Sequence, residues 1–195
     1  MFRSIEEVLA GPTVPSADLS AAPSEMGALP DLPARLLALA GEDERLTRAA
    51  CALPAAAARR RAVALCRADH GRVLRSVVEV SGWPTSSVVG ENASIAALQI
   101  LLHAQDPGLL LSCRPLIAEA VAEKSTPAIH LAYVDDACAV QQGRRQTYGT
   151  QIDPRLLRPY PVEDADTVDE RRAAVGLPPL DTALNQVLGV MKRPR

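Results

Sequence analysis

The stretch ASIAALQILLHAQ, residues 93–105, decides the fold class of this chain. It consists mainly of Ala, Leu and Ile, and it is longer than a typical strand, so it predicts a buried central helix. Gln99 and His103 lie four residues apart within it, and with Asn92 and Asp106 they form one stripe along the helix. A polar stripe on a central helix must face a cleft or find internal partners. The alternative is a stripe that faces solvent.

The composition favours packed helices over a β-sandwich. The chain has 195 residues, of which 48% are hydrophobic but only 3% are aromatic, so its core must be built from Leu, Val, Ile and Ala. This predicts a mainly α fold, a single helical domain with one small β-hairpin near residues 146–162. We expect residues 1–31, rich in Pro, Ala and Ser, to be a flexible segment and residues 32–195 to form the helical domain.

Apolar periodicity, interrupted by Gly and Pro, predicts the individual helices. Separate helices are expected at 32–41 and 43–51, followed by a long helix at 55–80 that Gly71 kinks or breaks. Pro84 excludes helix for Trp83, so residues 81–87 are expected to be a connection. Further helices are expected at 93–105, 108–123, 128–142, 168–175 and 180–191. Asp106-Pro107 is expected to cap and start the helix at 108–123.

The charge balance and the cysteines exclude several classes of protein. The chain has 21 Lys and Arg against 23 Asp and Glu, which leaves no basic face for nucleic acid. Four cysteines without a CxxC pair are interpreted as reduced thiols. No apolar run approaches the ~18 residues of a membrane span, and no signal core is present. We therefore expect a cytoplasmic protein that binds neither nucleic acid nor membrane, and the excess of Arg over Lys indicates a bacterial source.

The densest polar cluster is RQTYGTQ, residues 145–151. It predicts a short strand that carries Gln146, Tyr148 and Gln151 at the mouth of a site, where they can hydrogen-bond a small molecule. On the preceding helix Tyr133 and Asp136 are three residues apart and can share a face. The alternative is that these polar residues are buried and lock the hairpin onto the helices.

His103 is the candidate for acid–base chemistry. The histidines at 70, 103 and 130 have none of the spacings HxH, HxxxH or HExxH, so no metal site is expected. The chain also lacks the glycine-rich phosphate loops and the GxSxG elbow, and no cofactor is expected.

Several short stretches along the chain form one pattern: Asp43-Glu44-Arg45, Gly82-Trp83-Pro84-Thr85, Val89-Gly90-Glu91, His103-Ala104, Leu131-Ala132-Tyr133 with Asp136, Gln146-x-Tyr148-Gly149-Thr150-Gln151 and Val168-Asp169-x-Arg171-Arg172. Together these stretches resemble an uncharacterised bacterial family, domain of unknown function 6624, over roughly residues 32–182. The resemblance implies that the polar residues belong to one recurring constellation, but it implies no activity. The chain departs from the family where Asp136-Ala137 replaces the usual Asp-Arg and where His70 replaces an asparagine. If the family holds an anion with that arginine, this chain has lost the contact or binds something different, which suits a specialised member, for example in secondary metabolism.

Two function hypotheses follow. The first is an enzyme that processes a small molecule, with His103 as general acid or base and Asp136 orienting it or the substrate. The second is a non-catalytic binding or protein-interaction module in which the Gln-x-Tyr-Gly-Thr-Gln block is structural. In the enzyme hypothesis the catalytic residues are His103, Asp136 and Tyr148, and the substrate contacts are Trp83, Glu91, Gln99, Gln146 and Gln151.

Overall fold

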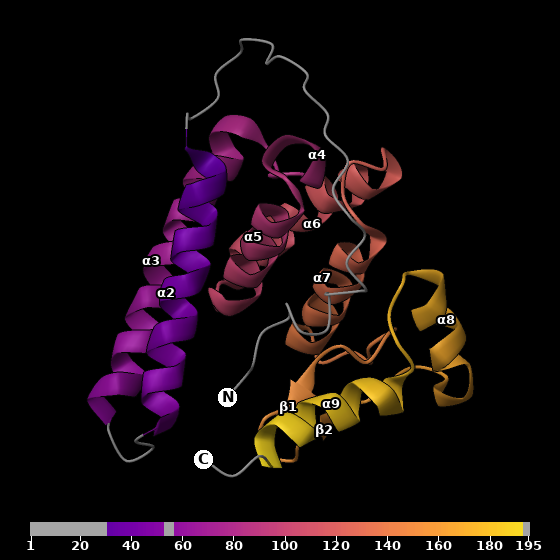
Figure 1. Cartoon of the computed structure of the whole chain (residues 1–195). Coiled ribbons are helices and arrows are strands. Elements are labelled where there is room, and N and C mark those ends of the chain that lie inside the picture. The colour runs from indigo at the N-terminus through magenta and orange to yellow at the C-terminus, as the bar shows by residue number, and fades with distance from the viewer. Residues whose placement is uncertain (1–30, 53–56, 193–195) are drawn as a thin grey trace, which may run out of the picture.

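The computed structural model describes residues 31–52 and 57–192 of the chain. The fold class expected from the sequence is confirmed: the protein is mainly α, with one very small hairpin (Figure 1). The segment expected to be flexible, residues 1–31, lies outside the described residues apart from Asp31. The helices are α2 (Leu32–Ala52), α3 (Ala57–Ser81), α4 (Ser86–Val89), α5 (Glu91–His103), α6 (Pro107–Ala122), α7 (Ala128–Gln141), α8 (Val168–Ala174) and α9 (Leu180–Lys192), with a 3-10 helix η1 (Ala165–Thr167) before α8.

Helix α5 lies at the centre of the fold, as its apolar composition indicates. It packs against α2 and α3 on one side and against α6 and α7 on the other (Figure 1). Every residue from Ala96 to Leu101 is buried. A helix buried on nearly all sides can accept polar residues only where they have internal partners or border a pocket. This requirement applies directly to Gln99 and His103.

The two helices expected at 32–41 and 43–51 are one continuous helix, α2. Gly41 is an ordinary helical residue, and a Cβ added to it would meet nothing within 4 Å. Glycine inside a helix costs only about 1 kcal/mol relative to alanine. The packing of α2 along both α3 and α5 outweighs that cost.

Gly71 also leaves its helix unbroken, since α3 continues from Ala57 to Ser81. A Cβ at Gly71 would lie 2.7 Å from Cβ of Ala104, a distance that real side chains do not adopt. The glycine therefore permits a close approach between α3 and the end of α5. Glycine at position 71 is therefore explained by tertiary packing and not by a break in the helix.

The start of α6 follows the predicted capping chemistry. The Asp106 side chain accepts a hydrogen bond from the backbone N–H of Leu109 at 3.0 Å, and Pro107 occupies the first turn. Both features suit a helix N-terminus, where backbone N–H groups lack partners inside the helix. The short helix α4, by contrast, lies in the stretch expected to be a plain connection.

The hairpin is smaller than expected. Strands β1 (Ile152–Asp153) and β2 (Arg158–Pro159) pair in antiparallel fashion. The preceding residues 146–151, expected as a strand, form bends and one isolated bridge between Gln146 and Val162. Gly149, with φ of +70°, turns the chain there.

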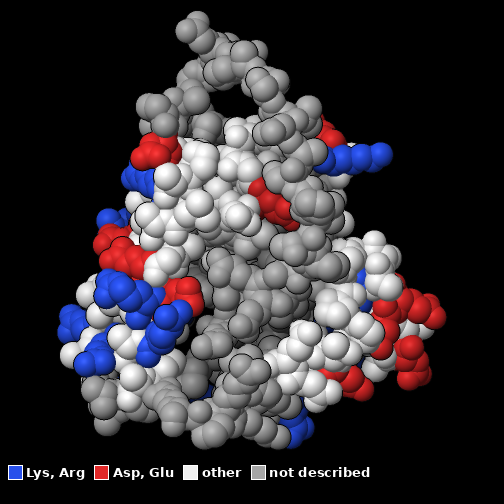
Figure 2. Space-filling model, viewed as in Figure 1, with Lys and Arg blue, Asp and Glu red and all other residues white. Residues whose placement is uncertain are grey.

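On the face seen in Figure 2, charged side chains of both signs lie mainly toward the edges of the described part of the chain. Basic and acidic residues lie together over α2 and α3, and acidic residues gather near α8 (Figure 2). Among the described helices, none combines the length and the apolar character that crossing a bilayer requires.

Candidate functional site

A small pocket lies where α2, α3 and the C-terminal half of α5 meet. Its space amounts to about 220 Å³ when the open solvent at its mouth is counted, and the room inside is that of about one water molecule. The two residues that the sequence placed on one stripe of α5, Gln99 and His103, both border it. Its lining consists of Ala40 and Asp43 from α2, Arg67 and His70 from α3, and Gln99, Ile100 and His103 from α5.

The shortest contact at this pocket joins His103 to a carboxylate. Nδ1 of His103 lies 2.6 Å from Oδ2 of Asp43. From the sequence, Asp136 was expected to orient His103 or the substrate. In the structure, the imidazole of His103 pairs with Asp43 instead. The two residues are 60 positions apart in the chain, so no local pattern announces the pair.

Asp43 is held in place by a second cation and by a hydroxyl. Arg67 donates to both carboxylate oxygens, from Nε at 2.6 Å and from Nη2 at 3.3 Å. Thr47 donates to Oδ1 at 3.4 Å and accepts from Arg67 at 3.1 Å. Burial alone would raise the pKa of Asp43, but the hydrogen bonds from His103 and Arg67 lower that pKa well below its usual range. Asp43 is therefore a carboxylate at neutral pH.

The charge of Asp43 determines the tautomer of His103. An ionised carboxylate only accepts hydrogen bonds, so Nδ1 of His103 must carry the proton that it shares with Asp43. In the neutral imidazole, Nε2 then has the free lone pair. Nε2 has no hydrogen-bond partner among the described residues, and the side chain is 23% exposed at the pocket. The geometry thus leaves a basic nitrogen available to a small molecule.

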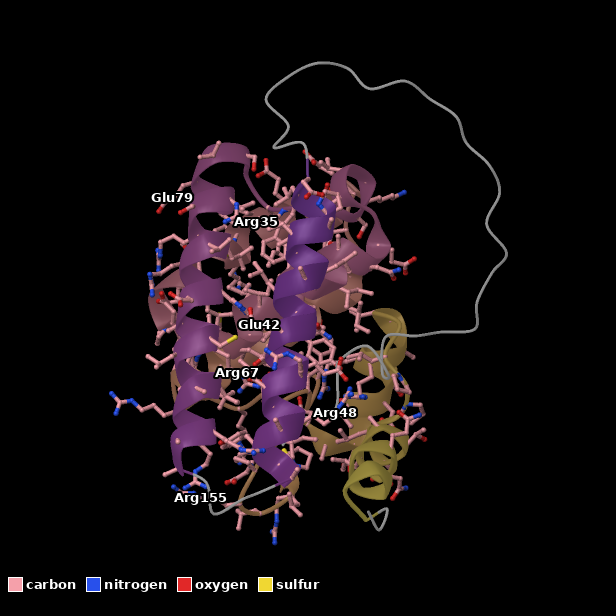
Figure 3. All side chains as sticks on the ribbon, turned by 60° about the vertical axis from the view of Figure 1, so that its left-hand side comes forward. Arg35, Glu42, Arg48, Arg67, Glu79 and Arg155 are labelled. Carbon is pink, nitrogen blue, oxygen red and sulfur yellow. The ribbon has the colours of Figure 1, made fainter. Side chains whose placement is uncertain are left out.

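A second group of ligand-type side chains lies beside the pocket, between α2 and α3. Nε2 of His70 is 3.3 Å from Oε2 of Glu42 and 3.4 Å from Sγ of Cys66. Donor atoms of these three residues all lie within 4.8 Å of one another, close enough to hold a metal ion. Glu42 and Arg67 are seen between the two helices in Figure 3. No metal site was expected from the sequence, although the spacing of four between Cys66 and His70 puts both side chains on one helical face.

Cys66 itself is unsuited to nucleophilic attack. Burial, and then the nearby carboxylates of Glu42 and Asp43, raise the pKa of its thiol to about 11. The attacking species in cysteine chemistry is the thiolate. Acid–base chemistry at His103 is therefore better supported than covalent chemistry here.

Residues of the RQTYGTQ block form hydrogen bonds with Asp136 of α7, away from the pocket. We call this group the loop network; it consists of Asp136, Gln146, Tyr148, Thr150 and Gln151. The fully buried carboxylate of Asp136 accepts from the backbone N–H groups of Thr147 at 2.8 Å, Tyr148 at 3.1 Å and Thr150 at 2.8 Å, and from the Thr150 hydroxyl at 2.9 Å. Its acceptor capacity is thus used by one loop. Asp136 and His103 share no hydrogen-bond partner among the described residues.

Gln146 and Gln151 complete the loop network. The Gln146 amide donates to the carbonyls of Gln151 and Tyr160 and accepts from the N–H of Gln151 at 2.7 Å. The Gln151 side chain donates to the Thr150 hydroxyl at 3.1 Å. Buried Arg172 of α8 donates to the carbonyl of Tyr148 at 2.6 Å. These contacts explain why the block curls into bends instead of extending as a strand.

The remaining predicted site residues lie apart from the pocket. Trp83 is buried in the core, and its Nε1 has no partner among the described atoms. Glu91 is exposed at the first residue of α5, twelve residues from His103, and a helical rise of 1.5 Å per residue separates their backbones by about 18 Å. Tyr148 is half-buried against the core. The pocket therefore unites Gln99 and His103 with residues that the sequence-based site did not include.

No curated protein and no solved structure gives a significant match to this chain. A family model does match, and it covers residues 30–190, a range that includes the pocket, the neighbouring cysteine and the loop network. The chain belongs to this family, described as the Family of unknown function (DUF6624).

Proposed function

We propose that this protein is an enzyme that processes a small molecule, with His103 as its general base and acid. The observation that carries the proposal is the 2.6 Å contact between His103 Nδ1 and Asp43 Oδ2 at the wall of the pocket. A carboxylate behind an imidazole fixes the tautomer and orientation of the ring, and it stabilises the imidazolium formed when the ring takes a proton.

In this mechanism Nε2 of His103 removes a proton from a water molecule or from a substrate group bound in the pocket. Asp43 stays ionised throughout and acts as a positioning residue. Gln99 lines the same pocket. A positioned base of this kind contributes on the order of 10²–10⁴-fold to a rate.

The proposal assigns the loop network a supporting role. Asp136 and Gln146 direct their side-chain hydrogen bonds to backbone groups of the loop, so both are already satisfied without a ligand. Trp83 and Glu91 lie outside the pocket lining. Among the predicted substrate contacts in the described part of the chain, Gln99 is the one that lines the pocket.

A non-catalytic binding module is the second candidate. It is favoured by the loop network, whose polar side chains hold the fold, while the small pocket is open to a ligand. In that case His103 would hydrogen-bond the ligand without moving a proton to or from it. The two candidates differ in turnover, not in the place where the ligand binds.

The test begins with a thermal-shift screen of metabolites against the intact chain. Ligands that stabilise the protein are then incubated with it and followed by mass spectrometry for conversion. We expect His103→Ala and Asp43→Asn to lower turnover by 10²-fold or more. Glu44→Gln, an exposed neighbour of Asp43 that pairs with Arg48, is the matched control and should turn over normally.

Wild-type turnover in His103→Ala would refute the catalytic assignment. A ligand that binds wild type but is never converted, and whose affinity falls in His103→Ala, would instead support the binding module. Circular dichroism of each variant checks that the helices are intact, so that loss of fold is not mistaken for loss of chemistry.

A further inference from the structure

We propose that Glu42, Cys66 and His70 form a binding site for one divalent zinc ion, adjacent to the His103 pocket. This goes beyond the proposed acid–base function, because it concerns a different set of side chains and does not depend on turnover. It also differs from the expectation drawn from the sequence, which contained no metal site.

The three side chains are of the types that zinc selects. Thiolate, imidazole and carboxylate are its usual protein ligands, whereas magnesium and calcium take oxygen ligands almost alone. A cysteine beside a histidine therefore favours zinc over the hard cations. In a reducing compartment such a thiol is also more readily used for metal binding than for a disulfide.

The separations between the donor atoms fit a tetrahedral ion. With zinc–sulfur bonds of about 2.3 Å and zinc–nitrogen or zinc–oxygen bonds of about 2.0–2.1 Å, tetrahedral angles place sulfur about 3.5 Å from nitrogen and nitrogen about 3.4 Å from oxygen. The observed separations are 3.4 Å from Cys66 Sγ to His70 Nε2 and 3.3 Å from His70 Nε2 to Glu42 Oε2. Sγ of Cys66 lies almost as close to Nδ1 of His70, at 3.7 Å, so one side chain must rotate before Sγ and the lone pair of Nε2 face a common ion.

Without an ion, hydrogen bonds can join the same three side chains. Nε2 of His70 can donate to Glu42 at 3.3 Å, and Nδ1 can accept from the Cys66 thiol at 3.7 Å. A zinc ion would replace both hydrogen bonds and would bind the deprotonated thiol, so zinc binding should release protons.

The fold presents these ligands with a suitable balance of rigidity and access. Cys66 and His70 are four residues apart on α3 and share its face toward α2, and His70 is only 5% exposed. Glu42 projects from α2 with a side chain that is 50% exposed, which gives the ion a route from solvent. Nearby Arg67 is already neutralised by Asp43, so it does not oppose the cation.

Three protein ligands leave a fourth position for water, as in catalytic zinc sites. His70 also lines the pocket that contains His103. The site is therefore placed to serve the same pocket. Its existence can nevertheless be tested without any substrate.

The experiment uses the full-length chain, stripped of metal with a chelator, and zinc chloride as the probe in calorimetric titration. Cobalt chloride is the second probe, because a thiolate ligand gives Co²⁺ an intense charge-transfer absorption band. We expect one equivalent of zinc to bind and the cobalt band to appear. Removal of a ligand in Cys66→Ser, His70→Ala or Glu42→Gln should weaken zinc binding by at least about tenfold, the lower end of the effect of outer-shell changes.

Matched controls are Cys51→Ser, which removes another partly exposed thiol, and Glu44→Gln, which removes a neighbouring exposed carboxylate. Both should bind zinc as wild type does. If a buried-ligand variant fails to fold, Glu42→Gln and the cobalt spectrum of wild type still decide the matter. Absence of a stoichiometric zinc site in wild type, or equal affinity in Glu42→Gln and Glu44→Gln, would overturn the proposal.

Discussion

Replacement of Asp136 tests the role of the loop network most directly. In Asp136→Ala the four hydrogen bonds from Thr147, Tyr148 and Thr150 lose their common acceptor. The Asp136 carboxylate is fully buried, so the abandoned backbone N–H groups cannot all turn to bulk water. The loop would have to open, or water would have to enter the space left by the side chain.

The magnitude follows from the number of abandoned donors. A buried donor without a partner costs about 1–3 kcal/mol, and water entering the truncated site offsets part of the total. We expect the free energy of unfolding to fall by about 3–5 kcal/mol, as for a broken buried charge network. Asp136→Asn should cost less, about 2 kcal/mol, because the Thr150 hydroxyl can reverse its role and accept from the new amide.

Urea denaturation followed by circular dichroism measures the change. Asp135→Ala is the matched control, since its carboxylate pairs with Arg114 at the surface and should contribute less than about 1 kcal/mol. Faster hydrogen exchange at the amides of Thr147, Tyr148 and Thr150 should accompany the loss of stability in Asp136→Asn. Equal stabilities for the Asp135 and Asp136 variants would refute the reasoning, because the buried acceptor would then have no measurable role.

Two further predictions concern the helical core. Gly71→Ala should lower the free energy of unfolding by about 1–3 kcal/mol, because the added Cβ overpacks against Ala104. Gly41→Ala should raise the free energy of unfolding by about 0.5–1 kcal/mol, because nothing lies within 4 Å of its added Cβ. Thermal denaturation that ranks the two variants the other way would contradict the packing argument. Burial lowers the pKa of His130 to about 4, so between pH 6.5 and pH 4 the unfolded chain takes up a proton that the folded chain does not, and stability falls by up to about 3 kcal/mol as the pH decreases through that window. His130→Leu should remove this part of the pH dependence, as measured by urea denaturation at a series of pH values; an unchanged slope would show that other groups cause it.

Local features of the sequence were sufficient to predict the helical architecture. The apolar run of residues 93–105 indicated a central helix, and Asp106-Pro107 indicated the start of the next one. Both predictions depend on neighbouring residues only. The helix boundaries predicted at Gly41 and Gly71 were wrong, because both helices continue through these residues. Tertiary packing stabilises the helices there, and local propensity does not include that contribution.

The candidate site could be predicted only in part, for the same reason. Gln99 and His103 were identified by their spacing on one helix, and both line the pocket. The partners Asp43 and Arg67 lie 60 and 36 positions before His103 in the printed sequence, and only the packing of α2 and α3 against α5 brings them there. Residues 145–151 are polar, as the sequence shows, but they form bends instead of the predicted strand. The reason is that the carboxylate that accepts hydrogen bonds from this loop belongs to Asp136, on helix α7.

The loop network and the network of Asp43, Arg67 and His103 at the pocket differ in how their replacement by apolar residues would change stability. This difference helps to decide which of the two serves a function. Asp136 satisfies backbone N–H groups, which no hydrophobic side chain could do, so its presence is explained by stability alone. Asp43, Arg67 and His103 instead satisfy mainly one another, through side chains. Buried ionic groups of that kind can often be exchanged for hydrophobic residues of similar size with no loss of stability. Folding therefore accounts for the loop network but not for the pocket network, and this is the physical ground for placing the proposed site at His103.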